Sequence, residues 1–168
     1  LYIMAALHRS QQEGSEAAVK YVLAGSVASA VSLYGITLVF GTAGTTYLAG
    51  IMANSGLYTE PLFVVGVVLL FAGFLFKLAV FPFHSWAPDV YQGAPHQAVT
   101  FIGTASKVGA VGIIIRALLL APDSEVITNG LLVLCVLSMT VGNLAALVQR
   151  DIKRLLAYST VAHAGYLL

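Results

Sequence analysis

The chain has 168 residues, of which 59% are hydrophobic and only 9% are charged. A soluble domain carries about 25% charged residues, and so few charges could not cover an apolar core of this size with a polar surface. The formal net charge of +1 excludes a nucleic-acid-binding protein, because that function needs a basic patch that neutralises phosphates. The composition therefore predicts a protein that lies in a lipid bilayer.

Four apolar segments are long enough to cross a hydrocarbon core about 30 Å thick, which takes roughly 20 helical residues. They cover residues 17–40, 61–83, 98–120 and 130–148, and a partial fifth covers 153–168. Backbone groups in lipid must pair within their own segment, and these segments are too continuous for barrel strands, so we expect helices. The sequence predicts an all-α, polytopic transmembrane bundle that forms one domain over residues 1–168.

The basic residues predict the orientation of these spans. Arg9 and Lys20 flank the start of the first span, and Arg150, Lys153 and Arg154 lie in the connector after the fourth. The connectors near 41–60 and 121–129 contain no Lys or Arg. Four crossings return the chain to its starting side, and the positive-inside rule assigns that side to the cytoplasm.

Two lysines lie inside predicted spans, Lys77 in the second and Lys107 near the centre of the third. A lysine at mid-helix costs about 2.5–3.5 kcal/mol on an insertion scale, so it indicates a functional site that faces protein or water. Burial also disfavours the ammonium, which favours proton exchange by the amine. The alternative is snorkelling; Lys107 is about 15 Å from either end of its span, too deep for that, whereas Lys77 is nearer its end.

Pro82 predicts a discontinuous helix near the end of the second span, because proline lacks a backbone donor and tends to kink or break a helix. His84 follows Lys77 by seven residues, which is two helical turns. Histidine titrates near neutrality, so a proton step from Lys77 to His84 across the break is one hypothesis. The other is an interfacial histidine beside Trp86 in an aromatic belt.

Three further residues complete the candidate proton relay. Glu16 and Lys20 are four residues apart, in the order that favours a helical ion pair. This pair is either an interfacial salt bridge or the mouth of a polar pathway. His163 lies about ten residues into the fifth segment, by helical numbering, and is either a relay group or a hydrogen-bonded core histidine.

Motifs for bound cofactors are not found in the sequence. Its single cysteine, Cys135, excludes a disulfide framework within the chain. No phosphate-binding glycine loop follows a strand, and the four histidines lack metal-ligand spacing. We therefore expect no NAD, flavin, iron–sulfur cluster or metal ion to bind this chain.

Three runs carry a family resemblance: FKLAVFPFHSWAPDVYQGAP at 76–95, VTFIGTASKVG at 99–109 and DIKRLLAYSTVAHAGYLL at 151–168. They resemble the subunit N family of bacterial NADH-quinone oxidoreductase, an antiporter-like family of the respiratory complex I membrane arm. The PDVYQGAP element favours subunit N over its sister subunits. The chain departs from the usual pattern at His96 and Gln97, where relatives commonly carry small residues or proline.

The resemblance implies a proton-translocating membrane subunit in the inner membrane of a bacterium, with no redox centre of its own. Quinone, NADH, FMN and iron–sulfur clusters are then expected in partner subunits, and other membrane-arm subunits are the expected partners. It also implies relay roles for the candidate residues, which are Lys77, Lys107, His84, His163, Glu16 and Lys20. The family's essential glutamate and a later lysine are expected outside this sequence, which begins at Leu1 and is interpreted as a central fragment.

Two alternatives remain open at this point. The chain could belong to a multi-subunit cation/proton antiporter or to a membrane-bound hydrogenase, which share broken helices and buried lysines. It could also be a structural membrane scaffold whose buried charges only fix the packing of the helices.

Overall fold

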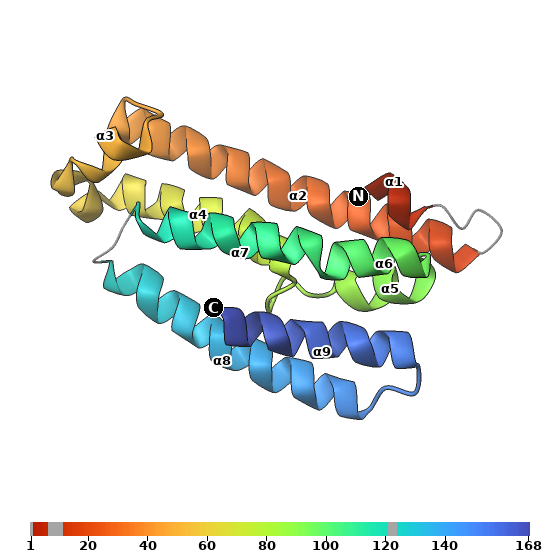
Figure 1. Ribbon diagram of the computed structural model, residues 1–168. Coiled ribbons are helices and arrows are strands. Elements are labelled where there is room, and N and C mark those ends of the chain that lie inside the picture. Colours follow the sequence, from red (N-terminus) through yellow and green to blue (C-terminus); the bar gives the residue numbers. More distant parts are fainter. Residues whose placement is uncertain (1, 7–11, 121–123) are drawn as a thin grey trace.

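A computed structural model describes residues 2–6, 12–120 and 124–168 (Figure 1). All regular structure in these ranges is helical, which confirms the predicted all-α class. The helices are α1 (Tyr2–Ala5), α2 (Gln12–Ala43), α3 (Leu48–Met52), the 3-10 helix η1 (Ser55–Thr59), α4 (Pro61–Leu78), α5 (Trp86–Gly93), α6 (His96–Gly103), α7 (Ala105–Leu118), α8 (Glu125–Leu147) and α9 (Ile152–Leu167). Arg9, which the orientation argument used, and residues 121–123 of one connector lie outside the described residues.

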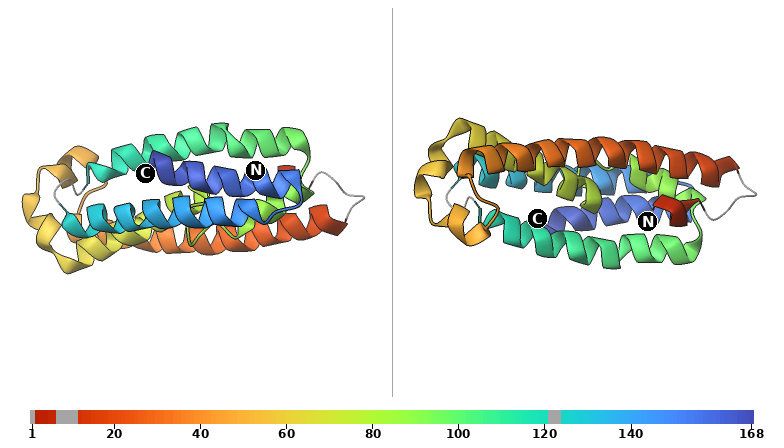
Figure 2. Two further views of the ribbon diagram at one scale, coloured as in Figure 1. Left: turned by 90° about the horizontal axis from the view of Figure 1, so that it is seen from below. Right: turned by 90° about the horizontal axis from the view of Figure 1, so that it is seen from above.

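The long helices run side by side along one axis, as the views in Figures 1 and 2 agree. α2 packs along α4, α4 packs on α7, and α8 packs on α9. The short helix α5 contacts both α2 and α9. α3 and η1 lie at one end of the bundle, and the connector between α8 and α9 lies at the other (Figure 1).

Four helical stretches are long and apolar enough to cross a membrane: Gly14–Ala43, Pro61–Leu78, His96–Leu118 and Glu125–Leu147. Their outer faces expose large apolar side chains, such as Leu23, Val108 and Leu147 at 63%, 74% and 81%. A water-exposed surface rarely carries apolar area on this scale. The multi-pass membrane architecture predicted from composition is therefore confirmed.

Two glycines allow neighbouring helices to approach closely. A Cβ atom at Gly35 of α2 would lie 2.5 Å from the backbone nitrogen of Leu70 in α4, and one at Gly142 of α8 would lie 2.6 Å from that of Ala162 in α9. Real Cβ atoms do not approach backbone this closely. Small residues at such crossings are typical of membrane helix packing, where close van der Waals contact drives association.

The predicted discontinuity near Lys77–Pro82 is present, but its first cause is Ala79 and not Pro82. Ala79 adopts the left-handed conformation (φ 61°, ψ 41°), its N–H donates to Phe76 O, and the N–H of Val80 donates to Leu75 O, both at 3.0 Å. These two bonds form a Schellman cap that ends α4 at Leu78, five residues before the predicted end of the span at residue 83.

A second interruption lies within the third span, which the sequence predicts to be one continuous helix. Thr104 (φ −115°, ψ −80°) separates α6 from α7. Its hydroxyl donates to the carbonyl oxygen of Thr100 at 2.7 Å. Such hydrogen bonds from Ser and Thr to the preceding turn bend helices, and here the bend lies three residues before Lys107.

Candidate functional site

Lys77 lies in the last turn of α4 and faces α2. Its Nζ donates to the hydroxyl of Tyr21 at 3.4 Å and lies 5.7 Å from the centroids of the Tyr2 and Tyr21 rings. Ring faces at this distance attract a cation. Tyr21 is itself fully buried and stacks on Trp86 with ring centroids 4.6 Å apart. A rigid aromatic cluster therefore holds one side of the lysine.

The other side of Lys77 borders a groove between α2, α4 and α7. The groove has a volume of about 570 Å³, and its lining includes the hydroxyl-bearing residues Ser29, Ser32 and Ser106. A cavity of this size with several polar groups can hold water molecules that bridge them. Lys77 is thus half-buried, with space in which its ammonium can move.

Lys107 is more enclosed, with a residue exposure of only 7%. Its Nζ crosses from α7 to α9 and donates to the backbone carbonyl of Thr160 at 3.1 Å. The hydroxyl of Thr160 in turn lies 3.5 Å from that of Tyr91 on α5. Neither Lys107 nor Lys77 forms a salt bridge with an acidic residue in the part of the chain that the structure describes.

His84 lies in the interruption between α4 and α5, and its ring contacts α9 rather than the partners of Lys77. Its ring stacks on Phe81 at 5.6 Å and tilts against Tyr158 of α9 at 6.4 Å. Its Nδ1 is buried and has no hydrogen-bond partner within the described ranges. The contacts of Lys77 and His84 do not include one another, so a proton step between them requires an intervening group such as water.

His163 lies on an exposed face of α9 and contacts the ring of Tyr166 edge-on at 5.6 Å. It follows Thr160, the partner of Lys107, by three residues. The structure therefore brings Lys107 to the same helix as His163 without placing the two side chains in contact.

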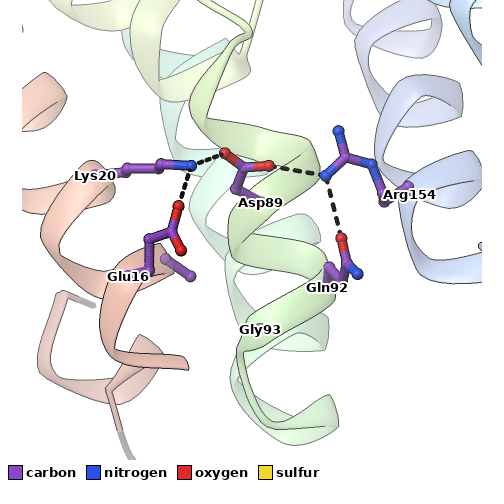
Figure 3. Close-up of a pocket in the computed structure, with 7 residues that line it drawn as sticks. Glu16, Lys20, Asp89, Gln92, Gly93 and Arg154 are labelled. Atoms are coloured by element: carbon purple, nitrogen blue, oxygen red, sulfur yellow. Dashed lines mark hydrogen bonds and ion pairs between the residues drawn. The ribbon is translucent and has the colours of Figure 1, made fainter. Parts of the chain in front are cut away.

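Glu16 and Lys20 form the ion pair that their spacing predicts, with Nζ 2.7 Å from Oε1. Figure 3 shows that Lys20 also reaches Asp89 of α5, at 2.8 Å, and that the other oxygen of Asp89 binds Arg154 of α9, at 2.8 Å. Arg154 also donates to the amide oxygen of Gln92 at 3.1 Å. These five residues line a cleft of about 220 Å³ and are called the charged cluster below.

Asp89 is the centre of the charged cluster, and the sequence analysis missed it. Burial raises the pKa of its carboxyl, but hydrogen bonds from Lys20 and Arg154 lower it by more, so the net pKa lies below the ordinary value. The sequence does contain a signal for Asp89, because an aspartate soon after a helix break in an apolar region needs a cationic partner. That partner could not be chosen from spacing, since Arg154 lies 65 residues away.

The charged cluster joins the N-terminal part of α2 to the first turn of α9 through α5, so the basic residues at both positions lie at one end of the bundle. Metal binding has no support in the described ranges, where three or more His, Cys, Asp or Glu side chains nowhere gather. The chemistry that these residues can perform is reversible proton binding at amines and imidazoles within a membrane.

Lysines inside the membrane region beside interrupted transmembrane helices are typical of membrane transport proteins. The family model described as NADH:quinone oxidoreductase/Mrp antiporter, transmembrane, matches residues 1–168. The chain belongs to this family.

Individual relatives show which members of this family the chain resembles. The chain is 52% identical to NADH-quinone oxidoreductase subunit N 2 of Syntrophobacter fumaroxidans, over all of this chain and 36% of that protein. It is 44% identical, with a TM-score of 0.82, to a chain of respiratory complex I from Thermus thermophilus, covering 98% of this chain and 35% of the other. It is 25% identical, with a TM-score of 0.86, to a chain of the Mrp complex from Dietzia sp. DQ12-45-1b, covering 98% and 31%. The chain thus spans about a third of the length of these relatives.

Proposed function

We propose that this chain is the central part of a subunit-N-type, proton-translocating membrane subunit of an NADH:quinone oxidoreductase. The backbone fold alone does not distinguish complex I from the Mrp complex, since the TM-scores to their chains are similar, 0.82 and 0.86. Sequence identity favours subunit N, at 52% against 25%. NADH, FMN, iron–sulfur clusters and quinone then belong to partner subunits, and the membrane is the bacterial inner membrane.

The observation that carries this proposal is the contact of Lys107. A carboxylate partner would stabilise the charged ammonium and oppose release of its proton. The Thr160 carbonyl, which lies 3.1 Å away, accepts a hydrogen bond from an ammonium and, more weakly, from a neutral amine, because both carry N–H groups. The lysine can therefore change its charge without losing its position, as a proton relay requires.

The test is Lys107→Ala in the full-length subunit within its complex. Sealed vesicles would report proton uptake with a pH-gradient dye alongside quinone-dependent NADH oxidation. We expect the ratio of protons to electrons to fall while the complex still assembles. Arg116→Ala is the control, because Arg116 lies exposed at the end of the same helix. A normal ratio in the Lys107 variant would reject the relay.

We also propose that the end of the bundle with the charged cluster faces the cytoplasm. Lys20, Lys153 and Arg154 lie there, whereas the connector over 41–60 at the opposite end contains no Lys or Arg. Cysteines placed at Thr45 and Ser124, in a Cys135→Ser background, should react with an impermeant thiol reagent added from the periplasmic side. Reaction only from the cytoplasmic side would reverse the orientation.

The second candidate function is that of a cation/proton antiporter subunit, which the likeness to the Mrp complex favours. Purifying the parent complex separates the two possibilities. Flavin and iron–sulfur subunits that accompany this chain would support the oxidoreductase, and their absence would support the antiporter.

A further inference from the structure

Ser138 on α8 is fully buried, although it lies in a transmembrane helix whose outer face is apolar. Its hydroxyl oxygen accepts a hydrogen bond from the backbone N–H of Phe81 at 3.0 Å. The same hydroxyl donates to the carbonyl of Leu134, one turn earlier in α8, at 2.6 Å. The donation to Leu134 directs a lone pair of the oxygen toward Phe81, so both functions of the hydroxyl are used.

The break between α4 and α5 creates the need for this bond. Phe81 follows the Schellman cap at Ala79 and precedes Pro82, so its N–H has no acceptor within either helix. A backbone group without a partner is costly inside a membrane, where water is scarce. On the other side of the break, the indole N–H of Trp86 donates to the carbonyl of Phe76 at 3.1 Å. The break is thus held from α5 by Trp86 and from α8 by Ser138.

The position of Phe81 matters for the candidate relay because its ring stacks on His84 at 5.6 Å. α8 is in turn tightly packed on α9, through the contact of Gly142 with Ala162. α9 supplies the Thr160 carbonyl to Lys107 and the Tyr158 ring to His84. One helix pair, α8 and α9, therefore contacts Phe81 in the break, His84 in the same segment and the central lysine, Lys107.

We propose that Ser138 is a positioning residue that fixes the break between Lys77 and His84 relative to the α8–α9 pair. It relays no proton itself, because its hydroxyl pairs with a backbone N–H and a backbone carbonyl, neither of which is titratable. Its loss lets the segment from Ala79 to Ser85 move away from α8, and His84 moves with Phe81. This proposal deepens the proposed function and rests on it for the role of the relay.

The test uses Ser138→Ala in the full-length subunit within its complex. Hydrogen–deuterium exchange resolves the Phe81 amide as the difference between two overlapping fragments with the same start, one ending at Val80 and the other at Pro82, because Pro82 has no amide. Loss of the acceptor should speed exchange of this amide about tenfold, the factor expected for one buried hydrogen bond. The second readout is the pH profile of proton translocation in sealed vesicles, which should shift because the surroundings of His84 change.

The control is Thr140→Val, two residues further along α8. Thr140 is exposed, and its hydroxyl donates only to Val136 of the same helix, at 2.8 Å. This variant loses a hydroxyl from α8 without touching the break, so both readouts should match the unmodified protein. Ser138→Cys keeps the size of the side chain with a weaker acceptor, and it replaces the alanine variant if that one does not assemble.

Faster exchange at Phe81 together with a shifted pH profile supports the proposal. Unchanged exchange shows that the bond does not hold the break, and faster exchange with an unchanged profile shows a bond with no influence on the relay; either result overturns the proposal. The exchange measurement does not depend on proton translocation. Rejection of the role proposed for Ser138 is therefore distinguishable from rejection of the proposed function, which Lys107→Ala tests.

Discussion

The surroundings of Lys77 and Lys107 differ in the kind of partner that each lysine has. Both lie within three residues of a helix interruption, Lys77 before Ala79 and Lys107 after Thr104. Lys77 meets a phenol hydroxyl and two ring faces, and it borders a groove of about 570 Å³. Lys107 is 7% exposed and is held by a single carbonyl of another helix.

This difference separates two requirements of a relay. A group that passes a proton along needs room and alternative partners, because its geometry changes between receiving and releasing. A group that stores a proton at a fixed depth needs a partner that tolerates both charge states. The Lys77 groove satisfies the first requirement and the Thr160 carbonyl satisfies the second, so the two lysines should respond differently to the same substitution.

The largest effect is expected for Lys107→Arg. The guanidinium has five N–H donors and stays charged, because it is not deprotonated in proteins. Among the residues that the structure describes, this enclosed site offers only the Thr160 carbonyl as an acceptor in contact with the side chain. We expect proton translocation to fall about tenfold or more, together with assembly, because buried donors without partners destabilise the site. Native electrophoresis and vesicle assays measure the two effects. A variant that assembles normally would show that the site is as open as that of Lys77, and one that also pumps normally would show that Lys107 need not release a proton.

Lys77→Arg should instead assemble normally, because the groove has room for the guanidinium and the tyrosine rings still attract a cation. Proton translocation should still fall, by about tenfold or more, since arginine does not release its proton. His84→Ala should be milder, because water in the break can replace the imidazole. Full translocation in the arginine variant would mean that Lys77 supplies charge only, and the path would then run through Lys107 and His163.

The functional interest of both lysines and the position of the break could be predicted from the sequence, because each depends only on the free energy of one residue in its own helix. A lysine in a long apolar run is expensive wherever the run folds, and Pro82 cannot continue a helix. The Glu16–Lys20 pair follows from helical spacing in the same way. These features require only that the helices form.

The parts that the sequence did not predict depend on neighbouring helices. The left-handed conformation of Ala79 is rare for a residue other than glycine and has no signal in the residue type. The Ser138–Phe81 bond joins residues 57 positions apart, and the Lys107–Thr160 bond joins residues 53 apart. Unless the packing of the helices is known, nothing in the sequence distinguishes Ser138 from the other small residues of the bundle.

The smallest effect is expected for Asp89→Asn, which changes the charged cluster, whose bonds among the described residues do not include Lys77 or Lys107. Asp89 on α5 binds Lys20, the neighbour in sequence of the Lys77 partner Tyr21, and Arg154 on the helix that holds Lys107. The Asp89–Arg154 pair is partly exposed and contributes about 0.2–1 kcal/mol, typical of exposed pairs. The melting temperature of the purified complex should therefore fall slightly, and proton translocation should change little.

The pH dependence of the melting temperature shows whether the small loss in Asp89→Asn comes from the charge of Asp89. Because hydrogen bonds hold the pKa of Asp89 below its ordinary value of 3.8, its charge stabilises the fold above that value and ceases to do so as the pH falls through the lowered pKa. The difference in melting temperature between the unmodified protein and Asp89→Asn should be constant near neutrality and shrink below about pH 4. Glu16→Gln is the matched control, since it removes an exposed carboxylate but leaves both bonds of Asp89 in place. A large loss of translocation in the Asp89 variant at unchanged melting temperature would instead place Asp89 in the relay and end the distinction between a structural cluster and the two lysine sites.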